Sequence, residues 1–253
     1  MTGQPSLAPF FRLVALDSID STNLEAQRLA RAGAPEGTLV WAREQTSGRG
    51  RRGRQWSSPP GNLYLSLLLR PAAAPAEAAG LGFLAAVALA EVLTELLPQE
   101  RAVRCKWPND VMVDGAKIAG ILLEAEAMGE ASPALVLGIG VNVGNHPEGL
   151  AYPVTSLAAV GGGASVEDLL QRLAERLLAW HSQWRRDGFA PVRARWLEFV
   201  AGLGEAVELR LDGQVIRGRF AALDPSGALL LELPEGGRRL VTAGDVSYPV
   251  PSA

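Results

Sequence analysis

Residues 48–54, GRGRRGR, place four arginines and three glycines in seven positions of a chain whose net charge is −3. Arginine forms paired hydrogen bonds with phosphate and carboxylate groups, and glycine lets a loop change conformation at low steric cost. This arginine loop (residues 48–54) therefore fits a clamp that closes on an anion. The two alternatives are a solvated charged turn and a loop that binds RNA or DNA.

The arginine loop also matches the dinucleotide-binding pattern G-x-G-x-x-G between Gly48 and Gly53. That pattern needs a helix directly after the glycines, so that the helix N-terminus meets the pyrophosphate. The following residues contain Pro59-Pro60-Gly61, which cannot start such a helix. The sequence therefore excludes this kind of nucleotide site.

Three other segments carry polar groups where apolar ones would be expected. Lys117 begins the apolar run KIAGILLE, and a buried lysine is costly unless it is paired with an anion. Its alternative position is the strand edge, pointing to solvent. Asn142 lies within GIGVNV and needs a hydrogen-bond partner, either a ligand or a neighbouring loop. The segment KWPND (residues 106–110) adds Lys106 and Asp110, although it would also serve as a plain turn.

Composition excludes several classes of chemistry. Cys105 is the only cysteine, so an internal disulfide and a cysteine-based metal site are both excluded. A pI of about 5.6 argues against a general nucleic-acid binder. The N-terminus lacks the pattern of a signal peptide, and the longest uncharged apolar stretch, residues 78–90, is too short to span a bilayer. We expect a soluble cytoplasmic protein without membrane contact.

Hydrophobic periodicity predicts the elements that must position these groups. Thr22 and Glu25 have the spacing of a capping box, which predicts a helix over 22–32. The other predicted helices cover 78–97, 165–184 (capped near Ser165) and 191–200, and the predicted strands cover 38–43, 62–70, 102–107, 110–127 (with a turn at Asp114-Gly115) and 134–143.

Near Gly204 the pattern changes to short strands separated by tight turns at Asp212-Gly213 and Ser226-Gly227. This pattern is typical of a small all-β barrel. We therefore predict two domains, at residues 1–203 and 204–253, packed against each other because the connection is short.

Six segments together resemble the biotin–protein ligases, also called biotin–[acetyl-CoA-carboxylase] ligases. They are IDSTN (19–23), EQTSGRGRRGRQW (44–56), NLYLSLLLR (62–70), KWPNDVMV (106–113), KIAGILLE (117–124) and GIGVNV (138–143), and they occur in the family's order. The resemblance implies an α+β fold: a mixed central β-sheet with helices on one face, as in class II synthetase-like catalytic domains, followed by an SH3-like β-barrel.

The resemblance also implies an activity. Members join biotin to ATP with Mg²⁺, which gives biotinyl-5′-AMP and pyrophosphate, and then transfer biotin to one lysine of a biotin carboxyl carrier protein. No metal site built from protein side chains alone is expected, and a homodimer is compatible with the resemblance. Longer bacterial members carry an N-terminal DNA-binding domain, for which IDSTN begins too early here, so we expect the monofunctional type without specific DNA binding.

Residue roles follow from the same resemblance. Ser21, Thr22 and Asn23 would line the biotin site, with Gln45 near the ureido ring. Lys117 would hold the biotin carboxylate and the α-phosphate as the main electrostatic catalyst, and Arg49 and Arg51 would be the other two catalytic residues. The remaining expected positions are Gly48, Arg49, Gly50 and Arg51 for the biotin carboxylate or adenylate phosphate, Trp56 and Asn142 for the adenine, Gly120 and Leu122 for the apolar part of biotin, and Lys106 and Asp110 on the ATP or Mg²⁺ side.

Two other functions compete with this interpretation. Lipoate–protein ligases share the catalytic fold and the acyl-adenylate chemistry, but they lack this arginine loop and typically the C-terminal barrel. An RNA-binding module would use the barrel and the basic loop. Assays with biotin or lipoate separate the two enzymes, and an RNA shift assay at two salt concentrations tests the third function.

Overall fold

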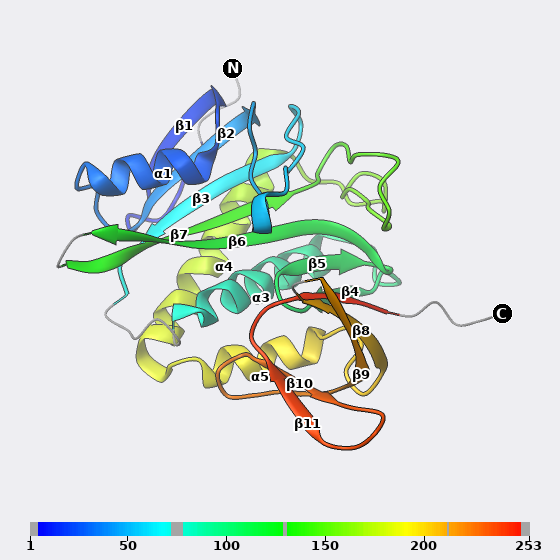
Figure 1. Ribbon diagram of the computed structural model, residues 1–253. Coiled ribbons are helices and arrows are strands. Elements are labelled where there is room, and N and C mark those ends of the chain that lie inside the picture. The colour runs from blue at the N-terminus through cyan, green and yellow to red at the C-terminus, as the bar shows by residue number, and fades with distance from the viewer. Residues whose placement is uncertain (1–4, 72–77, 129–130, 212, 249–253) are drawn as a thin grey trace.

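The computed structural model describes residues 5–71, 78–128, 131–211 and 213–248, and in these ranges the chain forms two β-sheets (Figure 1). The larger sheet has seven strands in the order β1-β2-β3-β7-β6-β5-β4. Its elements are β1 (Arg12–Ile19), α1 (Thr22–Arg31), β2 (Thr38–Gln45), the short 3₁₀ turn η1 (Arg51–Gly53), β3 (Leu63–Leu69), α3 (Gly80–Leu96), β4 (Val103–Lys106), β5 (Asp110–Val113), β6 (Ala116–Met128), β7 (Ala131–Val141), α4 (Val166–Asp187) and α5 (Ala190–Phe199).

The mixed character of the sheet is confirmed, because β1 runs parallel to β2 while the other neighbouring strands are antiparallel. Strand β1 has no counterpart among the strands predicted from the sequence. Its side chains are exposed or half-buried along the edge of the sheet, so the strand lacks the strong apolar pattern of β3, which is buried throughout. The predicted helix start at Ser165 is confirmed, since its Oγ accepts a hydrogen bond from the backbone N–H of Asp168 at 3.0 Å.

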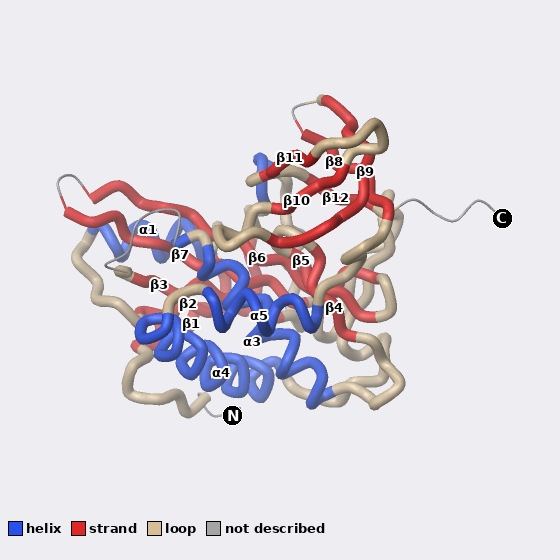
Figure 2. Tube along the Cα trace, turned by 90° about the horizontal axis from the view of Figure 1, so that it is seen from below, coloured by secondary structure: helices blue, strands red, loops and turns tan. Residues whose placement is uncertain are grey.

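Helices cover both faces of the large sheet, so the expectation of helices on one face only is wrong. Figure 2 shows α3, α4 and α5 together on one side of the strands. On the other face, Ala26 and Ala30 of α1 pack against Val40, Leu68 and Val136. Helix α1 is amphipathic and needs one apolar neighbour, whereas α3 is apolar nearly all round and is buried between the sheet and the other helices.

The smaller sheet is antiparallel and follows α5. Its strands are β8 (Ala206–Leu211), β9 (Gln214–Leu223), β10 (Leu229–Glu232), β11 (Arg238–Val241) and β12 (Asp245–Ser247), in the order β11-β10-β9-β8-β12. Among the described residues, β11 and β12 are the two edges and do not pair, so the predicted closed barrel is an open five-stranded sheet here. The predicted turn at Ser226-Gly227 is present between β9 and β10, whereas Asp212 of the other predicted turn lies outside the described residues.

The connection between β4 and β5 contacts the turn between β9 and β10 of the small sheet. The indole Nε1 of Trp107, which is 2% exposed, donates a hydrogen bond to the carbonyl oxygen of Gly227 at 3.0 Å. A Cβ added at Gly227 would lie 2.9 Å from the ring of Phe83 in α3, so the turn approaches the large domain closely. None of the helices in the described ranges is long and apolar enough to cross a membrane.

Candidate active site

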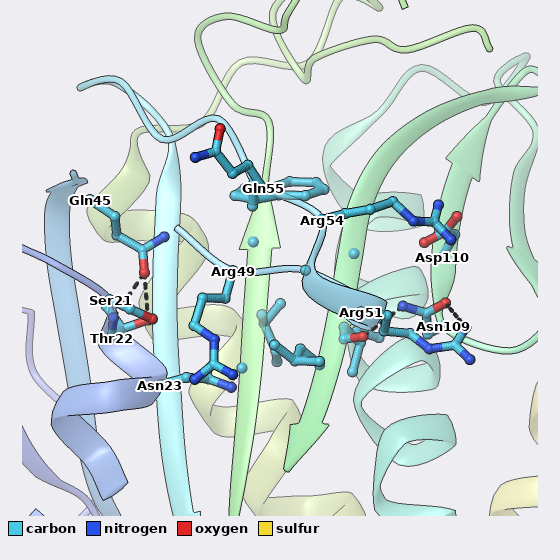
Figure 3. Close-up of a pocket in the computed structure, with 18 of the residues that line it drawn as sticks. Ser21, Thr22, Asn23, Gln45, Arg49, Arg51, Arg54, Gln55, Asn109 and Asp110 are labelled. Carbon is cyan, nitrogen blue, oxygen red and sulfur yellow. Dashed lines mark hydrogen bonds between the residues drawn. The ribbon is translucent and has the colours of Figure 1, made fainter. Parts of the chain in front are cut away.

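A cavity opens between the first turn of α1, the arginine loop and strands β6 and β7 (Figure 3). Most residues predicted for the site meet here, although they come from distant parts of the sequence. Those that line the cavity are Ser21, Thr22, Asn23, Gln45, Arg49, Gly50, Arg51, Trp56, Asp110, Lys117, Gly120 and Leu122.

One wall of the cavity is a hydrogen-bonded set of polar side chains from α1 and β2. The backbone N–H of Thr22 donates to Gln45 Oε1 at 2.8 Å, and the Thr22 hydroxyl lies 3.1 Å from the same oxygen. Gln45 in turn donates from Nε2 to Ser58 Oγ at 2.9 Å. The predicted capping box is therefore wrong: Ser21 is the N-cap residue, its side chain makes no capping bond, and the Thr22 hydroxyl belongs to the cavity wall.

The two glycines of GIGVNV each make room for a protein side chain. Gly138 lies beneath Asn23, and a Cβ at this position would be 2.1 Å from Asn23 Oδ1. Gly140 lies beneath Trp56, whose indole nitrogen would be 2.6 Å from an added Cβ. Gly120 of β6, which pairs with Gly140, also faces the Trp56 ring, and a Cβ added there would lie 3.1 Å from the nearest ring atom. The missing Cβ atoms therefore let Asn23 and Trp56 lie flat on the sheet as two walls of the cavity.

Lys117 is held inside the cavity by an opposite charge. Its ammonium nitrogen lies 2.6 Å from Asp110 Oδ1, and its side chain is only 17% exposed. The same nitrogen lies 5.3 Å from the centre of the Trp56 ring and 5.9 Å from that of Tyr152. The alternative in which Lys117 points to solvent is therefore wrong, because the strand start is covered by an anion and two aromatic rings.

The arginine loop is folded rather than extended into solvent. The backbone N–H of Gly50 donates to the Arg54 carbonyl at 2.7 Å, and that of Trp56 donates to the Gly48 carbonyl at 2.9 Å. The φ angle of Arg52 is +55°, a left-handed conformation that closes the turn. The loop predicted to close on an anion therefore already has a shape defined by backbone hydrogen bonds.

The arginines of this loop already contact acceptor groups within the protein. Arg51 donates from Nη1 to Asn109 Oδ1 at 3.0 Å and to the Gly244 carbonyl at 3.4 Å. Arg54 pairs with Asp245 of the small sheet, and Arg52 lies 3.9 Å from the same carboxylate. Burial lowers the pKa of the Arg51 guanidinium, and Asp245 acts in the opposite direction. A half-buried guanidinium whose nearest partners are neutral oxygens is a favourable contact for an incoming anion.

Three predicted site residues lie outside this cavity. Gly48 supports the loop, because an added Cβ would lie 2.4 Å from both Ser58 Oγ and the Trp56 carbonyl. Asn142 borders a neighbouring pocket together with Trp56, and its Nδ2 donates to the Thr155 carbonyl at 2.9 Å, so it does bond to a neighbouring loop. Lys106 lies 5.8 Å from the ring of Tyr248, and burial lowers its pKa.

Other residues of the cavity were not predicted. They are Arg54, Gln55, Leu65, Asn109, Ile121, Gly138, Ile139, Gly140, Tyr152 and Asp245. Most belong to segments that the sequence analysis had singled out, so closer use of those motifs would have found them. Tyr152 lies in a loop and Asp245 begins β12, and neither belongs to a motif of its own.

The chemistry available in the cavity is electrostatic. Lysine and arginine side chains meet hydroxyl, amide and indole groups, and the described residues contain no group of three or more His, Cys, Asp or Glu side chains that could hold a metal ion. Such a site suits a reaction in which two anions are brought together and negative charge develops between them.

Comparisons with known proteins point to one group. A sequence model described as the Biotin/lipoate A/B protein ligase family matches residues 15–142, and one described as the biotin protein ligase C-terminal domain matches residues 202–248. The chain is 40% identical over 235 residues to a biotin–[acetyl-CoA-carboxylase] ligase of Paracoccus denitrificans, with 90% of this chain and 97% of the relative covered.

Two further proteins extend this similarity. A bifunctional ligase/repressor BirA of Bacillus subtilis is 34% identical over 91% of this chain and 72% of its own length. The solved structure of a biotin protein ligase from Aquifex aeolicus, in complex with biotin and ATP, superimposes with a TM-score of 0.77 at 28% identity, covering 93% of this chain and 97% of that one.

Proposed function

Because this chain belongs to the Biotin/lipoate A/B protein ligase family, we propose that it is an ATP-dependent biotin–protein ligase. It activates biotin as biotinyl-5′-AMP and transfers the biotinyl group to a lysine of a biotin carboxyl carrier protein. The names of the relatives and the match of residues 202–248 to the biotin protein ligase C-terminal domain favour biotin over lipoate.

The observation that carries the proposal is the meeting of Lys117 and Arg51 with the polar wall of Thr22 and Gln45 in one cavity. In the first step a carboxylate oxygen of biotin forms a bond to the α-phosphorus of ATP, and the bond to pyrophosphate breaks. Both reactants are anions, so fixed cationic donors offset their repulsion and stabilise the charge that develops. In the second step the lysine amine attacks the carboxyl carbon, and AMP leaves.

We assign the roles of the cavity residues accordingly. Ser21, Thr22, Asn23 and Gln45 bind the biotin ring system through their polar groups, and Leu122 with Gly120 forms the apolar side. Lys117 contacts the carboxylate and the α-phosphate. The loop residues Gly48, Arg49, Gly50 and Arg51 bind the carboxylate or the adenylate phosphate, Trp56 and Asn142 bind the adenine, and Lys106 and Asp110 lie toward the ATP end.

The folded arginine loop gives a reason why the intermediate is retained. Biotinyl-5′-AMP is a mixed anhydride that water hydrolyses, so a covering loop protects it until the carrier lysine arrives. The rings of Trp56, which follows the loop, and of Tyr152 lie 5.3 and 5.9 Å from the Lys117 ammonium nitrogen and shield it from solvent. Magnesium enters as part of the MgATP substrate, for which Asp110 and Asn109 offer oxygen atoms beside the cationic groups.

The partners that we propose are biotin, MgATP and the carrier protein. The domain boundary at residues 203 and 204, a homodimer, a cytoplasmic location, and the absence of membrane contact and of specific DNA binding remain predictions. The ends of both predicted domains, residues 1–4 and 249–253, lie outside the described residues.

The decisive experiment incubates the protein with biotin, MgATP and a carrier domain and measures the intact mass of the carrier. We expect a mass increase of one biotinyl group. A carrier whose acceptor lysine is replaced by arginine serves as the matched control and should gain no mass. Modification with lipoate but not with biotin would contradict the proposed substrate, and modification without ATP would contradict the adenylate route.

A further inference from the structure

We propose that Glu124 is a positioning residue, which sets the side chains of Arg49 and Asn23 so that both face the substrate. The inference rests on the proposed function, because it concerns the biotin site of that same reaction. Glu124 is not itself part of the cavity lining, whereas Arg49 and Asn23 both are. Its effect on the substrate must therefore pass through these two residues.

The two oxygens of the Glu124 carboxylate serve two different segments of the chain. Oε1 lies 3.0 Å from Nη2 of Arg49 on the arginine loop. Oε2 accepts a hydrogen bond from Nδ2 of Asn23, in the first turn of α1, at 2.8 Å. Figure 3 shows the Arg49 side chain extending from the loop toward Asn23. Glu124, on strand β6, thus connects the arginine loop with helix α1 through these two contacts.

The amide of Asn23 has little freedom to turn away from Glu124. It is 4% exposed, it lies on Gly138, and its Oδ1 accepts a hydrogen bond from Ser66 Oγ at 2.6 Å. With Oδ1 occupied in this way, Nδ2 must point to the carboxylate. A carboxylate held on one side by a buried amide keeps its second oxygen in a defined place for Arg49.

The same hydrogen-bond network continues around the cavity to Trp56, whose backbone N–H bonds to Gly48 of the arginine loop. Ser66 Oγ lies 2.8 Å from Thr22 Oγ1, Thr22 bonds to Gln45, and Gln45 bonds to Ser58, whose hydroxyl donates to the Trp56 carbonyl at 2.9 Å. Glu124 therefore connects the polar wall that faces the biotin ring with the guanidinium that faces the anionic end. We infer that replacing this one carboxylate loosens Arg49 while the wall itself remains.

The chain offers a matched control on the same strand. Glu126 lies two residues further along β6, and its Oε1 pairs with Arg31 Nε at 2.7 Å, away from the cavity. Glu124→Gln removes the charge beside Arg49 but keeps an oxygen that accepts from Asn23. Glu126→Gln removes the same kind of carboxylate–arginine pair without touching the site.

The experiment measures the dissociation constant for biotin by calorimetry, and KM and kcat for biotin, in wild type, Glu124→Gln, Arg49→Gln and the double variant. An exposed ion pair contributes little free energy, whereas a charge-assisted hydrogen bond contributes more. The contact between Glu124 and Arg49 lies between these cases, so we expect Glu124→Gln to weaken biotin binding about 5- to 10-fold. KM should rise by the same factor while kcat stays near wild type, since the contact serves binding. Glu126→Gln should leave all three quantities unchanged.

The double variant separates positioning from a general structural effect. If Glu124 acts through Arg49, the double variant should bind biotin as weakly as Arg49→Gln alone. Additive losses, an unchanged affinity in Glu124→Gln, or tighter binding would overturn the proposal. Should Glu124→Gln fail to fold, Glu124→Asp takes its place with the same cycle, and an affinity equal to wild type overturns the proposal. Absence of carrier biotinylation by wild type would contradict the proposed function only, because biotin binding is measured independently.

Discussion

The ammonium nitrogen of Lys117 lies 2.6 Å from Asp110 Oδ1, so the one lysine that begins the apolar part of β6 has a fixed position across the cavity. The pair joins the start of β5 to the start of β6, two antiparallel neighbours whose register shifts between Val111 and Met112. Lys117 therefore presents its charge to the reacting atoms without first having to be ordered.

Replacing Lys117 by alanine should slow adenylate formation by about 10²–10³-fold, which is typical of the loss of a preorganised charge contact. Biotin binding should change far less, because the polar wall of Thr22 and Gln45 remains. Pyrophosphate release measures the first effect and calorimetry the second. Arg31→Ala removes a cation on the far end of α1 and should leave both unchanged. Pyrophosphate release near the wild-type rate would remove Lys117 from the site.

Replacing Arg51 by glycine should speed the escape of biotinyl-5′-AMP more than it slows its synthesis. Arg51 links the arginine loop to Asn109 and Gly244, and a charge-assisted hydrogen bond contributes about 1.5–3 kcal/mol, which corresponds to roughly 10- to 150-fold faster release. Escaped adenylate acylates lysines of any nearby protein. Biotin labelling of albumin at equal ATP turnover measures this escape, and labelling no greater than with wild type would show that the loop is not a lid.

Replacing Gly138 by alanine should disturb the cavity although it adds only a methyl group. The new Cβ would lie 2.1 Å from Asn23 Oδ1, so Asn23 must move and lose its bonds to Ser66 and Glu124. We expect destabilisation of about 1–3 kcal/mol, as for overpacked cores, together with weaker biotin binding.

Gly82→Ala is the matched control for that change. Gly82 lies in α3, and no atom comes within 4 Å of an added Cβ, so alanine should stabilise the protein by about 0.5–1 kcal/mol. Urea unfolding of the two variants measures both effects. Equal stability changes in Gly138→Ala and Gly82→Ala would contradict the packing of Asn23 on the sheet.

Much of this site could be predicted because the motifs contain the groups that the chemistry needs. Thr22 shows where sequence reasoning failed: its spacing to Glu25 suits a capping box, but the hydroxyl bonds to Gln45, 23 residues away. A local pattern cannot reveal such a distant partner. Strand β1 was missed because an edge strand needs few buried side chains. Asp245 was missed because a lone aspartate at the start of a short strand has no signal until folding places it beside Arg54.

Acid should weaken the packing of α4 through His181. This side chain is 4% exposed, and burial lowers its pKa below the usual 6.5, with Glu36 opposing that shift and Arg185 adding to it. The unfolded chain therefore binds a proton more readily, so the free energy of unfolding falls as pH drops below about 6.5 and levels off below the pKa of the folded state. Urea unfolding between neutral pH and about pH 5.5 should show this slope, and His181→Phe should reduce it. An equal slope in the variant would contradict the assignment to His181.

The pairing of Arg54 with Asp245 limits how freely the two parts of this chain can be exchanged during evolution or engineering. A chimera that joins residues 1–203 to the small sheet of a relative would have to rebuild the apolar core that the two parts share. It would also lack a fitted partner for the arginine loop unless the donor sheet carried a carboxylate at the start of its last strand. An exchange of the small sheet must therefore preserve Gly244 and Asp245 at the start of β12 as the partners of the arginine loop.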